Sequence, residues 1–132
     1  EVVTARDARF SLQYCAAAML ILGGVRLSAF TPEALARSDI RALMPRITVT
    51  TDPDIASAYP GRRMARLRIV LTNGRVLDHF QQTRKGDPDD PLSDAELEMK
   101  FDELAATFLS PSNAGALKRQ IFTGTDPVGA LQ

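Results

Sequence analysis

The stretch MARLRIVLTNGRVLDHFQQT, residues 64–83, decides the fold class. Its centre, Asn73-Gly74, lies between two strand-like runs at 64–72 and 75–83. An Asn-Gly pair between such runs favours a two-residue type I′ turn. The stretch therefore predicts an antiparallel β-hairpin.

The expected turn also sets a register for the hairpin. A two-residue turn pairs Ile69 with Asp78 and Arg68 with His79. One face is then mostly apolar and the other becomes polar away from the turn, as in a sheet covered on one side. Asp78 is the one misfit, because this register places it on the apolar face.

Helix signals flank the hairpin in the sequence. Ser11, Thr31 and Ser93 stand where N-caps are expected, and Glu96 completes a capping box with Ser93. Gly23-Gly24 marks a helix end. The expected helices are Ser11–Leu22, 31–37, 38–44, one opening at Ser93 and one at 113–121, with a further strand at 46–51.

This order of helices, strands and helices predicts a two-layer α+β domain. Its sheet is small and antiparallel, with about three strands and one Asn-Gly hairpin, and helices pack on it. A chain of 132 residues suits one domain spanning 1–132. Residues 1–8 are expected to be an irregular lead-in and residues 123–132 a loose tail.

Composition narrows the range of partners. Sixteen basic and sixteen acidic residues cancel, which argues against a nucleic-acid or an acidic-membrane partner. The basic cluster Arg62, Arg63, Arg66 and Arg68 is local, and we interpret it as a solvated strand face rather than a phosphate site. No apolar run reaches the roughly 18 residues of a membrane span.

Cys15 and His79 are the only cysteine and histidine. One thiol cannot form a disulfide within the chain, which favours a reducing, cytoplasmic setting. We expect Cys15 to be a small buried thiol and His79 an exposed strand residue. The acid-rich loop 85–92 lacks the spacing of an EF-hand and is expected to be a solvated turn, so no metal site is predicted.

Tyr14 is the most interesting polar group. The helix Ser11–Leu22 is apolar all round, and Tyr14 shares its second side with Ala18 and Ile21. Tyr14 is either a core residue or a phenol that donates a hydrogen bond or a proton to an anionic substrate. Ser11, one turn earlier, is either an N-cap or part of the same site.

Several motifs together resemble the MmgE/PrpD family. The segment DARFSLQYCAAAMLILGG at residues 7–24 resembles the opening of that family's second domain. The pair NG at 73–74, the loop KGDPDDPLS at 85–93 and Lys100-Phe101 follow in the family's order. The family includes 2-methylcitrate dehydratases, cis-aconitate decarboxylases and iminodisuccinate epimerases.

The resemblance implies the smaller, lid-like C-terminal domain of a two-domain lyase or isomerase, inactive alone. It implies small di- or tricarboxylate substrates, with dehydration of 2-methylcitrate-like acids favoured, and no metal or organic cofactor. The implied partners are an N-terminal helical domain outside this chain and, as a further possibility, a second copy. Tyr14 is the implied catalytic residue, and Ser11 and Lys85 are the implied substrate-binding residues.

The alternative is a free-standing α+β binding module without catalysis. The two hypotheses differ in what covers the second side of the first long helix. The enzyme-fragment hypothesis predicts that Tyr14 lines an exposed cleft wall beside an apolar patch with Ala18 and Ile21. The module hypothesis predicts that the chain's own core buries this side.

Overall fold

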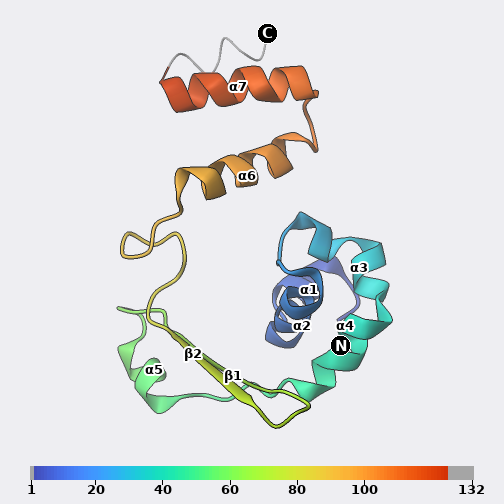
Figure 1. Ribbon diagram of the computed structural model, residues 1–132, viewed down its shortest axis with the longest axis vertical. Coiled ribbons are helices and arrows are strands. Elements are labelled where there is room, and N and C mark those ends of the chain that lie inside the picture. The colour runs from blue at the N-terminus through green and yellow to red at the C-terminus, as the bar shows by residue number, and fades with distance from the viewer. Residues whose placement is uncertain (1, 125–132) are drawn as a thin grey trace. The chain divides into compact units, whose positions relative to one another are not determined.

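The computed structural model describes residues 2–124. The chain divides into two compact units, Glu1–Asp52 and Pro53–Gln132, and each is described by itself. That both belong to the single domain expected from the sequence stays a prediction. Figure 1 labels the α-helices and the two strands.

The described part of the first unit contains helices and connecting loops but no strand. Ser11 caps its longest helix by accepting a hydrogen bond from the Tyr14 N–H at 3.2 Å. Gly23 ends that helix in the left-handed conformation, with φ at +76°. The elements are α1 (Ala5–Arg9), α2 (Leu12–Leu22), η1 (Leu27–Phe30), α3 (Pro32–Ala36), α4 (Ser38–Leu43) and η2 (Met44–Arg46).

The predictions for α2, α3 and α4 are confirmed, whereas the irregular lead-in at residues 1–8 is wrong. Thr4 and Asp7 form a capping box, in which each side chain bonds the other's backbone N–H. This local motif is enough to open α1, although the helix has only five residues and no apolar periodicity.

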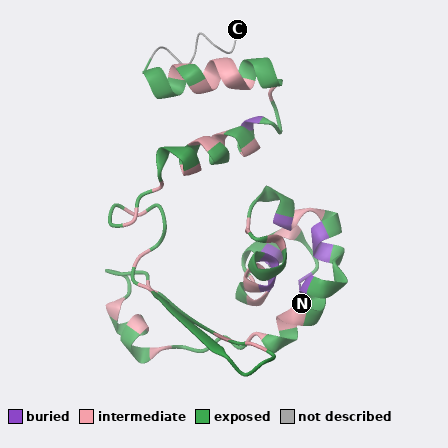
Figure 2. Ribbon diagram, in the orientation of Figure 1, coloured by how far each residue is buried: buried purple, intermediate pink, exposed green. Residues whose placement is uncertain are grey.

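The core of the first unit lies where α2 packs against α1, α4 and η2. Figure 2 shows buried positions among these helices. Tyr14 and Ile40 are its largest fully buried side chains. The cluster consists of Val2, Ala8, Tyr14, Ala17, Ala18, Ala29, Leu35 and Ile40.

The second unit contains the hairpin, so the α+β class is confirmed. Its elements are α5 (Pro53–Ala58), β1 (Ala65–Val70), β2 (Val76–Gln81), α6 (Asp94–Ala105) and α7 (Pro111–Thr123). The strands form a two-stranded antiparallel sheet. The run expected as a strand at 46–51 forms none, because β-prone residues become a strand only where a partner strand is present.

The hairpin differs from the prediction in its register. Leu71 and Arg75 close a three-residue loop, since the Leu71 N–H donates to Arg75 O and the Gly74 N–H donates to Leu71 O, both at 2.9 Å. A type I′ turn needs positive φ at both Asn73 and Gly74, but only Gly74 has it, at +80°. A tight turn followed by a left-handed glycine therefore replaces it.

The changed register shifts every cross-strand pair by one residue. Arg68 now lies opposite Asp78, and His79 lies opposite Leu67. The apparent misfit of Asp78 disappears, because the residue facing it across the sheet is a cation.

Helix α6 begins with the predicted capping box of Ser93 and Glu96. Its partner α7 is longer than expected and reaches Thr123, the first residue of the predicted loose tail. The rest of that prediction, residues 125–132, lies outside the described residues.

Among residues 53–124, Ala105 alone is buried. None of the helices described in residues 2–124 has the length and apolar character needed to cross a bilayer.

Candidate functional site

Tyr14 lies inside the core of the first unit. Its side chain is fully buried, and its hydroxyl donates a hydrogen bond to the Ala29 carbonyl oxygen at 2.5 Å. Its ring lies 6.2 Å from the Phe30 ring, tilted by 35°. The prediction that Tyr14 lines an exposed wall is therefore wrong, because the chain's own α1, α4 and η1 segments enclose it. Its catalytic role stays a prediction.

The phenol of Tyr14 is held neutral. Burial raises its pKa above the ordinary value of 10.0, and the positive charge of Arg41 opposes this in part. A neutral phenol at pH 7 can donate a hydrogen bond or a proton, but it is not a base.

The exposed apolar side of α2 is not the one expected. Leu12, Met19 and Leu20 are 65%, 49% and 53% exposed, whereas Ala18 is fully buried beside Tyr14. The helix does have two apolar sides, as the sequence indicates. Its own unit covers Tyr14 and Ala18, so Ile21, at 37%, is the one exposed member of the patch expected around Tyr14, Ala18 and Ile21.

Ser11 is next to Tyr14 through the backbone only. Its hydroxyl accepts the Tyr14 N–H as the cap of α2, while the Tyr14 hydroxyl points to Ala29. The two hydroxyls thus have separate partners and form no shared pair. Cys15 is half-buried, its thiol donates to Ala8 O at 3.4 Å, and burial raises its pKa.

A pocket opens on the first unit beside this core. Its walls include Val3, Thr4, Phe30, Pro32, Leu35 and Arg41. The Arg41 Nε–H donates to Leu35 O at 2.8 Å. This carbonyl belongs to the last turn of α3, so Arg41 holds that helix end while its guanidinium remains at the pocket wall.

Lys85 lies in the second unit, in the loop after the hairpin. Its ammonium pairs with Asp90 at 3.3 Å and with Glu96 at 3.4 Å. The hydrogen bond to Asp90 is the main reason why its pKa is raised. Glu96 also accepts the Ser93 N–H at 2.8 Å, so Lys85 connects the loop to the capped start of α6.

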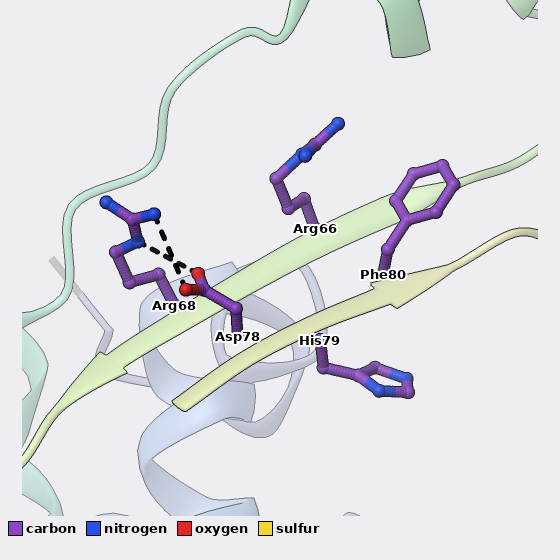
Figure 3. Close-up of a pocket in the computed structure, with 5 residues that line it drawn as sticks. All are labelled: Arg66, Arg68, Asp78, His79 and Phe80. Carbon is purple, nitrogen blue, oxygen red and sulfur yellow. Dashed lines mark hydrogen bonds and ion pairs between the residues drawn. The ribbon is translucent and has the colours of Figure 1, made fainter. Parts of the chain in front are cut away.

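One face of the hairpin gathers two arginines, an acid and an aromatic ring. Arg68 donates to both Asp78 oxygens, with Nε–Oδ1 at 2.8 Å. The Arg66 guanidinium lies over the Phe80 ring, 5.1 Å from its centroid. Figure 3 shows these four side chains on one face, with His79 on the other. This surface hollow is open, and Asp78 offsets the charge of Arg68.

His79 is an exposed strand residue, as expected, and its Nε2 lies 3.1 Å from Gln81 Oε1. The acid-rich loop is organised by ion pairs, with Arg84 and Asp87 joined at 2.7 Å. Within residues 2–124, no three His, Cys, Asp or Glu side chains are grouped closely enough to hold a metal ion.

Two features of possible functional use were not predicted from the sequence. The pairing of Arg66 with Phe80 follows only from the correct register. Arg41 shows no motif, because its contact with Leu35 depends on how α3 and α4 are connected. The one local signal for this contact is that a basic residue follows soon after the end of a helix, where it can bond to the last carbonyl groups.

Two comparisons bear on this architecture. Residues 1–121 match the family model described as the MmgE/PrpD C-terminal domain. The cis-aconitate decarboxylase of Homo sapiens is 30% identical over 108 residues, which are 82% of this chain and 22% of that enzyme. The chain thus spans about a fifth of the length of this curated relative.

Proposed function

We propose that this chain, which belongs to the MmgE/PrpD family and matches its C-terminal domain, is part of a lyase or isomerase acting on small di- or tricarboxylates. It contributes one wall of an active-site cleft and is inactive alone. Dehydration of 2-methylcitrate-like acids is the favoured reaction, and the similarity to a cis-aconitate decarboxylase makes decarboxylation its main competitor. The enzyme needs no metal or organic cofactor in this proposal.

The match over residues 1–121 is the observation that supports this proposal best. It spans most of the chain in both units, whereas a shared turn or cap would match only a short segment. The same proposal places the protein in the cytoplasm, in keeping with a single, half-buried thiol.

The exposed side of α2 supports a partner domain. Leu12, Met19 and Leu20 form an apolar strip on a helix whose other side is already in a core. Exposed apolar strips of this kind commonly mark an interface. We propose that the helical N-terminal domain of the same protein covers it, and a second copy of the chain is the alternative occupant.

Tyr14 is the proposed catalytic group of this chain. Its neutral phenol suits the return of a proton to a carbanion next to a carboxylate, or the protonation of a leaving hydroxyl. For this, the hydroxyl must exchange its bond to Ala29 for one to the substrate. Ser11 and Lys85 stay proposed substrate-binding residues, although the Ser11 hydroxyl caps α2 and Lys85 is paired with two acids.

The test is Tyr14→Phe in the full-length protein, assayed on 2-methylcitrate and cis-aconitate. If Tyr14 moves a proton, turnover falls about a hundredfold or more. The change also leaves the buried Ala29 carbonyl without its donor, which lowers the unfolding free energy by about 1–3 kcal/mol. Turnover is therefore measured well below the unfolding temperature of the variant.

The other tyrosine provides the matched control. Tyr59 is 65% exposed and lies in the second unit, so Tyr59→Phe is expected to leave both turnover and stability unchanged. If Tyr14→Phe keeps full turnover on an accepted acid, Tyr14 is a packing residue alone. If neither acid nor a related one is turned over by the parent protein, the proposed substrate class is wrong.

One observation favours the alternative, a free-standing binding module. That hypothesis predicts that the chain buries the Tyr14 side of α2 in its own core, and Tyr14 and Ala18 are fully buried. The two hypotheses separate on the exposed strip of α2. Leu12→Ser and Leu20→Ser should impair turnover by the full-length enzyme, but should leave a free-standing module folded and functional.

A further inference from the structure

The pocket on the first unit combines one fixed cation with apolar walls. Val3, Phe30, Pro32 and Leu35 supply the apolar surface, and Arg41 supplies the charge. Its volume is about 380 Å³, near the lower end of the range for small-molecule sites. Such a site suits a small ligand that has an anionic group on an apolar body.

Arg41 is positioned by one of its five N–H groups. Its Nε–H is used on Leu35 O, which fixes the plane of the guanidinium. The Nη groups remain for a ligand, because no ion pair joins Arg41 to a carboxylate within residues 2–124. A guanidinium held in this way matches the paired oxygens of a carboxylate.

Asp7 and Asp39, two acids near the pocket, are bound to groups other than Arg41. The Asp7 carboxylate accepts the N–H groups of the wall residues Val3 and Thr4. Asp39, two residues before Arg41, is paired with Arg37 at 2.6 Å. A second cation, Arg9, lies over the Phe30 ring at 5.4 Å from its centroid.

We infer that Arg41 binds a carboxylate of the substrate in this pocket, with the carbon skeleton against Phe30 and Leu35. The inference rests on the proposed function and assigns to this chain a substrate-binding residue for it. The Phe30 ring lines the pocket and lies 6.2 Å from the Tyr14 ring, so a ligand bound there would be close to Tyr14. That proximity is consistent with the influence of Arg41 on the ionisation of Tyr14.

The simpler role of Arg41 is to hold the end of α3. Arg41→Gln separates the two roles, because its amide retains an N–H donor for Leu35 O but has no charge. Arg41→Lys retains the charge but loses the paired donors. Arg46→Gln is the matched control, since Arg46 is an exposed arginine of the same unit that is not part of the pocket wall.

Steady-state kinetics of the full-length protein on cis-aconitate or 2-methylcitrate test the inference. We expect Arg41→Gln to raise KM about tenfold to a hundredfold, in the range of a lost charged hydrogen bond. Arg41→Lys should recover part of this loss, and Arg46→Gln should match the parent. An unchanged KM for Arg41→Gln, on an acid that the parent turns over, overturns the inference and leaves the proposed function standing.

A second readout excludes a merely structural effect. Suppose that Arg41→Gln and Arg41→Lys lower the unfolding free energy by the same amount and raise KM by the same factor. Arg41 then only holds the helix end, and the inference is wrong. Direct titration with cis-aconitate, observed through the NMR signal of the Arg41 Nε–H, reports binding without turnover. A parent protein that shows this shift but no turnover supports the site and contradicts the proposed function.

Discussion

The two units of the chain are stabilised in different ways. The first unit, with no sheet in its described part, buries eight residues in one cluster around Tyr14 and Ile40. The second unit has the sheet, the 13-residue helix α7 and several surface ion pairs, but only Ala105 is buried among its described residues. The comparison shows that a sequence can form regular secondary structure without also forming a buried core.

The difference follows from the interactions that hold the elements of each unit in place. In the first unit, short helices turn back on one another, and alanines allow α2 to approach its neighbours closely. In the second, hydrogen-bonded caps, a tight hairpin and surface pairs fix each element locally. Its apolar side chains remain exposed, for example Phe80 at 42% and Phe108 at 88%. We therefore expect tertiary contacts beyond this unit to contribute to its stability.

The largest expected effect comes from the core of the first unit. Ile40→Ala removes a fully buried side chain and should lower the unfolding free energy by about 2–5 kcal/mol. The matched change in the second unit, Phe108→Ala, removes a larger but exposed side chain and should change it by about 0.5 kcal/mol or less. Denaturant unfolding of the full chain measures both. Equal losses would show that the second unit has a core equivalent to the first.

Local chemistry made much of the fold predictable from the sequence. Ser11, Thr31 and Ser93 act within three residues of their own position, so their helices could be placed without knowing the tertiary structure. The same chemistry opens α1 at Thr4, but five residues are too few to show an apolar period. The strand predicted at 46–51 was wrong because its stability depends on a distant partner.

The candidate site was less predictable, because it depends on which side of an element is covered. The sequence of α2 shows two apolar sides, and the choice between them depends on where α1 and α4 pack. The register of the hairpin depends on one backbone angle at Asn73, which decides whether Arg68 faces His79 or Asp78. The contact between Arg41 and Leu35 has no counterpart in any local motif.

A substitution in the hairpin turn, Gly74→Ala, is expected to have an intermediate effect on stability and tests the local stabilisation of the second unit. Gly74 has φ at +80°, and nothing lies within 4 Å of an added Cβ, so Gly74→Ala changes conformational strain alone. We expect a loss of about 1–2 kcal/mol from the left-handed geometry. Hydrogen exchange of the hairpin amides should show it. Unaltered exchange in Gly74→Ala would mean that the turn contributes nothing to the stability of the hairpin.

Gly115→Ala is the matched control in the same unit. Gly115 lies inside α7 with ordinary helical geometry, and an added Cβ would lie 3.6 Å from Arg119 Nη1, an ordinary contact. Alanine is favoured over glycine inside a helix by about 1 kcal/mol, so this variant should stabilise α7. Opposite signs for the two substitutions would separate backbone strain from added volume as the cause.

The smallest expected effect on stability comes from an exposed ion pair of the first unit, Arg37 with Asp39. The Arg37 guanidinium beside Asp39 lowers the pKa of that carboxyl to about 2, from an ordinary value of 3.8. A lowered pKa stabilises the folded state above pH 3.8, and this contribution is lost as the pH falls from there towards 2. Asp39→Asn should remove that part of the acid sensitivity in thermal unfolding, with little effect at pH 7 because the pair is exposed. The Ile40 N–H donates to Asp39 Oδ1 at 2.8 Å, so its protection factor against hydrogen exchange should fall over the same pH window. An identical acid response in parent and variant would place the acid-sensitive step at another carboxylate with a lowered pKa, such as Asp7 in the first unit or Asp87 in the second.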